Sequence, residues 1–193
     1  MVTNIFITGL GGQGVVTLAK LLSGCASELG QKVSLFNSKG MAQRGGRVTS
    51  EIRISDEQDT MRGSRLASGG ADILLGMEIG ESANSAHFLK EGGIALLMDY
   101  AFVPTTMVLK KQDYPSLPQV VGAFKKITPR CFGIEKFSSP HNIYLLGVFS
   151  SISERFTPDS LKQSIRTNLK RNIEENLAVF YKGYEYGKSL VIS

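Results

Sequence analysis

The chain has 193 residues, of which 42% are hydrophobic and 20% are charged, and its formal net charge is +5. This size and composition predict one soluble globular domain spanning residues 1–193. No apolar run is long enough to span a bilayer and the N-terminus lacks the blocks of a secretory signal, so we expect a cytoplasmic protein without a membrane partner. The two cysteines, Cys25 and Cys131, are too few for a disulfide framework, a zinc site or an iron–sulfur cluster, and we interpret both as buried thiols.

Positive charge is concentrated in one part of the chain. A stretch with few acids carries a cluster of basic residues: Lys39, Arg44, Arg47, Arg53, Arg62 and Arg65. We interpret this cluster as a local site for an anion or an acidic partner. A nucleic-acid track would need interleaved aromatics or a recognisable module, so we expect no nucleic-acid partner.

The first glycine-rich segment, residues 4–14 (NIFITGLGGQG), organises the rest of the chain. Residues 5–7 form a continuous apolar run, which is typical of a parallel strand that is buried on both faces. Gly9, Gly11 and Gly14 follow at GxGxxG spacing, which allows a tight turn and directs free N–H groups at the start of a helix toward an anion. A plain strand-to-helix turn with no ligand is the alternative, because this motif alone is a weak signal.

A helix and a second strand follow the first glycine turn. Apolar residues recur at helical spacing over residues 15–29 and Gly30 ends the helix, after which residues 32–37 (KVSLFN) predict a strand that completes a βαβ unit. A nicotinamide-binding unit would end this strand with an acid that holds the ribose hydroxyls. The chain has Asn37 there, which disfavours an independent NAD dehydrogenase.

The second glycine-rich segment is residues 38–47 (SKGMAQRGGR), with three cations and an amide among its glycines. Arg44 offers a planar fork of donors that suits a carboxylate or a phosphate. An exposed hairpin tip with solvated arginines is the alternative interpretation. Residues 47–54 then alternate strictly, which predicts a half-exposed strand, antiparallel to the main sheet, with Thr49, Glu51 and Arg53 on its open face.

The middle of the chain continues the alternation of strands and helices. Residues 71–76 and 94–99 read as buried strands, and residues 78–90 predict a helix that Gly92 and Gly93 end. This order predicts an α/β fold: a Rossmann-like three-layer domain with a mostly parallel sheet, an antiparallel element after the second glycine loop, and C-terminal helices. Glu78 and Glu81 follow a strand end, where they either contact a ligand or complement a helix N-terminus.

The last part of the chain reads mainly as helices. The expected elements are short strands at 108–110 and 130–134, and helices at 117–124, at 141–149, and from Thr157 onward with a break near Asn168. Asn142 is a polar residue near the start of an apolar helix, where capping and a functional contact explain it equally well. We interpret His141 as a surface or capping residue rather than a base.

Neither a nucleophile elbow, nor a Walker lysine, nor a metal-ligand cluster stands out, so the chain is expected to be one part of an enzyme rather than a whole one. Residues 9–14 (GLGGQG) and 39–47 (KGMAQRGGR) together resemble the gamma-type subunit or domain of the 2-oxoacid:ferredoxin oxidoreductases. Residues 71–75 (ADILL) and 142–147 (NIYLLG) fit the same resemblance. The AQRGG form is most similar to the small beta subunit of the indolepyruvate-oxidising members.

The resemblance implies a role beside companion subunits. Those enzymes oxidatively decarboxylate a 2-oxoacid, pass electrons through iron–sulfur clusters to ferredoxin, and transfer the acyl group to coenzyme A. Thiamine diphosphate and the clusters belong to the companions, the thiamine site being in an alpha-type subunit, so this chain alone is expected to hold no cofactor or metal and no catalytic residue. By the resemblance, the residues that would line the shared active site are Gly9, Gly11, Gly12, Gln13, Gly14, Gln43, Arg44, Gly45 and Gly46.

A stand-alone nucleotide or coenzyme A binding module is the competing hypothesis. The sequence also leaves open which 2-oxoacid is used and whether the isolated chain forms a homodimer.

Overall fold

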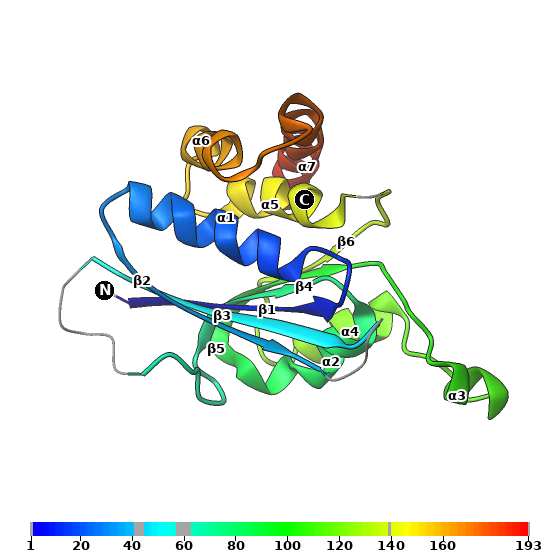
Figure 1. The fold of residues 1–193 in the computed structure, drawn as a ribbon. Coiled ribbons are helices and arrows are strands. Elements are labelled where there is room, and N and C mark those ends of the chain that lie inside the picture. Colours follow the sequence, from blue (N-terminus) through cyan, green and yellow to red (C-terminus); the bar gives the residue numbers. More distant parts are fainter. Residues whose placement is uncertain (1, 41–44, 57–62, 139, 193) are drawn as a thin grey trace.

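The computed structural model describes residues 2–40, 45–56, 63–138 and 140–192. Its centre is a six-stranded sheet in the order β2-β3-β1-β4-β5-β6 (Figure 1). The strands are β1 Val2–Leu10, β2 Lys32–Lys39, β3 Arg47–Ser55, β4 Ala71–Gly76, β5 Leu89–Met98 and β6 Cys131–Ile134. β1, β4, β5 and β6 pair in parallel, whereas β3 is antiparallel to both of its neighbours, β1 and β2. The predicted α/β fold with one antiparallel element is confirmed.

Helices cover both faces of this sheet. The helices are α1 Val15–Glu28, α2 Ile79–Asn84, the 3-10 helix η1 Ala86–Phe88, α3 Thr105–Leu109, α4 Leu117–Phe124, α5 His141–Ile152, α6 Pro158–Asn168 and α7 Ile173–Ile192. In Figure 1, α1, α5, α6 and α7 lie over one face, α2 and α4 lie under the other, and α3 projects away from the body. None of the helices in the described residues is both long enough and apolar enough to cross a membrane.

Alternation along β1 divides the core between these two faces. Ile5 and Ile7 pack with α1, α5 and the C-terminal helices, while Phe6 packs on the opposite face with η1 and α4. Its ring stacks on Phe88 with 4.2 Å between the ring centroids. Cys25 and Cys131 are buried free thiols, as expected.

β3 departs from the sequence prediction in two ways. It lies between β1 and β2, so these two strands, which α1 connects and which run in the same direction, are not neighbours in the sheet. It is also buried on both faces, because the segment around Leu66 covers the side that was predicted to be open: the Leu66 N–H donates to Glu51, which is only 1% exposed.

Three further local predictions need correction. The helix expected over residues 78–90 ends at Asn84, followed by η1, and Gly92 and Gly93 lie inside β5 near a register shift against β4 rather than ending a helix. Residues 108–110, expected as a strand, lie at the end of α3 and just beyond it. The helix at 117–124, the strand within 130–134 and the break between the last two helices are confirmed.

Candidate functional site

The two glycine-rich segments meet at the edge of the sheet where β1 ends and β3 begins. Leu10 is the register partner of Arg47 in the β1–β3 pair, which places the turn after β1 beside the hairpin before β3. There the Gly11 N–H donates a hydrogen bond of 2.9 Å to the Gly46 carbonyl oxygen. The two predicted segments are therefore in direct backbone contact, through residues 35 positions apart in the sequence.

A cavity of about 390 Å³ lies at this junction, on the α1 face of the sheet. The first glycine segment contributes Gly11, Gly12 and Gly14, and the end of β2 with the second segment contributes Lys39, Gly40 and Gly46. The cavity thus opens between the carboxyl end of β1 and the start of α1. Ligands of open α/β sheets bind in this kind of crevice.

The electrostatics of this cavity favour an anion. Helix α1 begins with no side-chain cap and no acid in its first turn, and no backbone acceptor among the described residues takes the N–H groups of residues 15–17. Unpaired N–H groups and the helix dipole make a helix start locally positive. Lys39 is exposed and forms no ion pair within the described part of the chain.

Gly12 and Gly14 are required by the backbone for different reasons. Both have positive φ, 96° and 86°, a region that disfavours residues with a Cβ. A Cβ at Gly12 would have no heavy atom within 4 Å, so the backbone there is open to a guest. A Cβ at Gly14 would lie 2.6 Å from Nδ2 of Asn142, so Gly14 allows α5 to approach the start of α1.

Gly9 and Gln13 serve the internal structure of the first loop. The Gln13 Oε1 accepts from Leu10 N–H at 2.7 Å, and its Nε2 donates to the Met77 carbonyl at 3.0 Å. A Cβ at Gly9 would lie 2.7 Å from this Oε1. Gln13 thus fixes the loop against the end of β4, and its contact with a ligand stays a prediction.

The remaining predicted site residues belong to the second segment. Gly45 has a φ of 68°, and a Cβ there would lie 3.2 Å from the Phe102 ring. Gln43 and Arg44 lie outside the described residues, so their part in the site stays a prediction.

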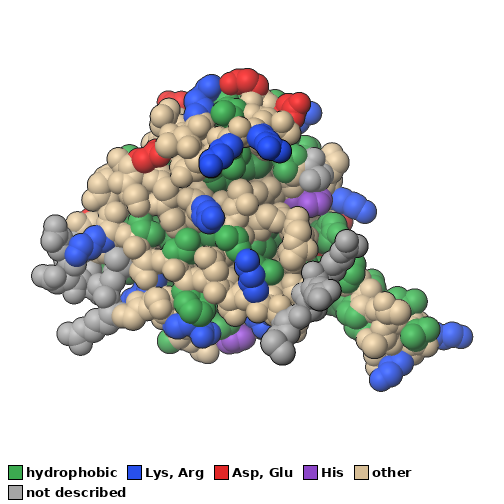
Figure 2. Space-filling model, in the orientation of Figure 1, with side chains coloured by type: hydrophobic (Ala, Val, Ile, Leu, Met, Phe, Trp, Pro, Cys, Tyr) green, Lys and Arg blue, Asp and Glu red, His purple; other side chains and the backbone are tan. Residues whose placement is uncertain are grey.

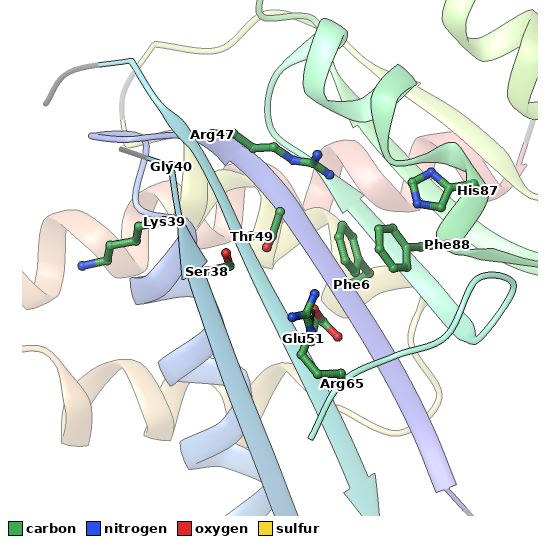
Figure 3. Close-up of a pocket in the computed structure, with 10 residues that line it drawn as sticks. All are labelled: Phe6, Ser38, Lys39, Gly40, Arg47, Thr49, Glu51, Arg65, His87 and Phe88. Atoms are coloured by element: carbon green, nitrogen blue, oxygen red, sulfur yellow. Dashed lines mark ion pairs between the residues drawn. The ribbon is translucent and has the colours of Figure 1, made fainter. Parts of the chain in front are cut away.

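A second cavity, of about 290 Å³, lies on the opposite face of the same strands (Figure 3). It shares Lys39 and Gly40 with the first cavity, so that Lys39 stands at the rim of both. The two arginines that line this second cavity each form an ion pair with a glutamate of the same chain. Arg65 pairs with Glu51 at 3.3 Å, and Arg47 pairs with Glu81 at 3.2 Å.

Glu78 and Glu81 are explained by structure within the chain. Glu78 is the N-cap of α2 and its Oε2 accepts from the Glu81 N–H at 2.8 Å, which favours the helix-terminus interpretation. Burial raises the pKa of Glu81, and the neighbouring Arg47 partly opposes this shift. Burial and the hydrogen bond to Glu78 also raise the pKa of Tyr114.

Asn142 lies next to the candidate site. The sequence left open whether it caps a helix or makes a functional contact. Pro140, not Asn142, is the N-cap residue of α5, and the Asn142 side chain packs against Gly14 with 8% exposure. The sequence signal for this contact was a polar residue within an apolar helix. His141 lies edge-on to Tyr100 with 5.1 Å between the ring centroids, and burial lowers its pKa.

The comparisons with known proteins agree with this fold. The family model described as pyruvate ferredoxin/flavodoxin oxidoreductase matches residues 4–186, so the chain belongs to this family. The resemblance to gamma-type subunits that was predicted from the sequence is confirmed.

Similar proteins include indolepyruvate oxidoreductase subunits IorB from two archaea. The one from Archaeoglobus fulgidus is 30% identical over 94% of this chain and 93% of its own length. The one from Thermococcus kodakarensis is 29% identical over 97% of each. The crystal structure of a keto/oxoacid ferredoxin oxidoreductase gamma subunit from Geobacter sulfurreducens has a TM-score of 0.65 at 19% identity, covering 98% of both chains, which supports the shared fold.

Proposed function

We propose that this chain is the small subunit of a 2-oxoacid:ferredoxin oxidoreductase that acts on indolepyruvate or another aryl pyruvate. Family membership and the names of its relatives support an oxidoreductase subunit, and the indolepyruvate relatives support the substrate class. A companion alpha-type subunit would hold thiamine diphosphate, and iron–sulfur clusters in the complex would carry electrons to ferredoxin. The chain is not expected to be active alone.

The residues of the chain fit this division of labour. Its only cysteines are buried in the core, and burial raises the pKa of Cys131 to about 11 and also raises that of Cys25. A cluster needs about four cysteine ligands, and the sequence has two cysteines. Among the described residues, no group of three or more potential ligands could hold a metal ion.

The cavity between the glycine segments fits an anionic group of coenzyme A. Coenzyme A supplies the thiol that accepts the acyl group, and it carries phosphates. The first-turn N–H groups of α1 and the Lys39 ammonium would hold a phosphate at the Gly12 backbone. The chain's role is then to position coenzyme A, not to react with it.

The single observation that carries the proposed placement of coenzyme A is the hydrogen bond from Gly11 to Gly46, because it joins the two glycine segments beside one cavity. The sequence prediction of a shared site required these segments to meet.

Steady-state kinetics of the reconstituted complex test the proposal. With the companion subunit present, the complex should oxidise indolepyruvate and reduce ferredoxin, whereas the isolated chain should not. Lys39→Gln should raise the KM for coenzyme A about three- to tenfold, since it removes one charge from the cavity rim. Lys20→Gln is the matched control, because Lys20 is exposed on α1 and is not among the residues that line the cavity.

Equal KM values in the two variants would refute the placement of coenzyme A. An isolated chain that binds coenzyme A as tightly as the complex does would support the stand-alone binding module instead.

A further inference from the structure

Residues 102–112, which we call the arm, expose an unusual amount of apolar surface. Phe102, Val103, Val108 and Leu109 are 51%, 38%, 60% and 78% exposed. In the rest of the described chain, only Leu29 and Tyr181 are large hydrophobic residues of comparable exposure. The arm carries α3 away from the body, and the space-filling view shows apolar side chains on the projection with basic ones beside them (Figures 1 and 2).

The base of the arm is firmly anchored. The Phe102 N–H and the Tyr114 hydroxyl donate to the same oxygen, Oε1 of Glu78, at 3.1 and 2.8 Å. Glu78 is only 1% exposed. Gly80 leaves room for the tyrosine, because a Cβ there would collide with its hydroxyl oxygen. One buried carboxylate therefore holds both ends of the excursion.

An anchored base with an apolar tip indicates a docking element rather than a loose loop. Water-exposed apolar surface gives the isolated chain no stability, whereas burial in a partner contributes roughly 25 cal/mol per Å². A helix of five residues is also too short to be stable by itself in water. Contact with another polypeptide would bury the apolar residues of the tip and stabilise its short helix.

The position of the arm indicates which polypeptide this is. A Cβ on Gly45 would lie 3.2 Å from the Phe102 ring, so the arm leaves the body beside the second glycine segment. A partner that binds the tip of the arm would therefore lie close to the rim of the candidate site. Under the proposed function, the companion subunit is the polypeptide that must approach this rim.

The charge of the arm also favours the companion over a second copy of the chain. Lys110 and Lys111 follow α3, and no acid occurs from residue 100 to residue 112. A second copy carries the same net charge of +5. A groove that accepts this tip should be apolar with acidic residues at its rim.

We propose that the arm inserts into an apolar, acid-rimmed groove of the companion alpha-type subunit and fixes that subunit against the two glycine segments. This inference rests on the proposed function, because it requires that a companion subunit exists. Leu109 is the main apolar contact of the tip, and Lys110 and Lys111 supply its charge contacts.

Co-expression with the companion subunit followed by a binding titration tests the arm. Leu109→Asp should weaken the association at least tenfold, whereas Leu29→Asp, at another exposed leucine, should leave it unchanged. The thermal midpoint of isolated Leu109→Asp should equal that of the natural chain, because the side chain is 78% exposed. The double variant Lys110→Glu/Lys111→Glu should also weaken the complex, and most strongly at low salt.

The outcomes separate the two proposals. If the natural chain binds its companion and Leu109→Asp binds equally well, the arm proposal is wrong and the proposed function stands. If the natural chain does not bind the companion at all, both fail. A homodimer of the natural chain that Leu109→Asp dissociates, with companion binding intact, would make a second copy the occupant and overturn the arm proposal.

Discussion

Gly12 and Gly14 are the two residues of the first glycine loop with positive φ. Replacing Gly14 by alanine should destabilise the chain more than replacing Gly12 by alanine. The added Cβ would lie 2.6 Å from Nδ2, 2.7 Å from Cγ and 3.1 Å from Cβ of Asn142. Its backbone would also have to keep a φ of 86°. The variant therefore suffers from backbone strain and from overpacking at the junction of α1 and α5.

The two costs can be estimated separately. A residue with a Cβ in the left-handed region costs about 1–2 kcal/mol. Forcing extra volume into a well-packed site costs about 1–3 kcal/mol. Gly14→Ala should thus lower the free energy of unfolding by about 2–5 kcal/mol, a large part of the total for a typical domain.

Gly12→Ala is the matched control. Gly12 has a φ of 96° but no heavy atom within 4 Å of an added Cβ, so this variant should show the backbone cost alone. Asn142→Ala removes the two closest atoms of the clash. In that background, the cost of Gly14→Ala should fall toward the cost of Gly12→Ala.

Urea unfolding followed by circular dichroism gives the five free energies that this comparison needs: those of the natural chain, the three single variants and the double variant. Equal losses for Gly12→Ala and Gly14→Ala would refute the reasoning. A cost of Gly14→Ala that does not change when Asn142 is alanine would refute it too, since the close approach of α5 would then not be the cause.

Two other predictions concern Arg44 and His141. Arg44→Ala in the assembled complex should raise the KM for coenzyme A or for the oxoacid several-fold, because its guanidinium is expected to hold a carboxylate or a phosphate; unchanged kinetics would contradict that role. Burial lowers the pKa of His141, so on acidification the unfolded chain binds the proton first and stability should fall as the pH drops below about 6.5. Urea midpoints at pH 7.5 and 5.5 should therefore differ less in His141→Gln than in the natural chain, and an equal difference in both would count against this account.

Local sequence signals predicted the elements that depend on local interactions. The continuous apolar run at Ile5–Ile7 and the glycines after it placed β1 and the start of α1. The bounds of α4, Leu117–Phe124, agree with the prediction, and in the structure a capping box and an early proline stand at its start. The family resemblance implied that the two glycine segments lie at one site, and the hydrogen bond from Gly11 to Gly46 shows that they are in contact.

Contacts between distant residues decided the features that were missed. Alternation along residues 47–54 correctly indicated a strand, but the pattern could not show that β3 inserts beside β1 or that Leu66 covers Glu51. Val108 lies within an apolar stretch that resembles a strand. In the structure this segment projects away from the sheet, where a helical turn satisfies its backbone instead (Figure 1).

The packing of Asn142 on Gly14 is a further example. Nothing near Asn142 in the sequence indicates that α5 crosses the start of α1. In the sequence, only its polarity within an apolar helix distinguishes this amide.

The central claim is that the cavity between the two glycine segments receives a negatively charged group. The most direct measurement compares Gly12→Asp with Gly12→Asn in the assembled complex, since both side chains tolerate the left-handed backbone and differ mainly in charge. A charge placed about 5 Å from a bound phosphate should weaken binding by more than about 1.4 kcal/mol, or tenfold. The account predicts a dissociation constant for coenzyme A at least tenfold higher for Gly12→Asp than for Gly12→Asn, and equal constants would contradict it.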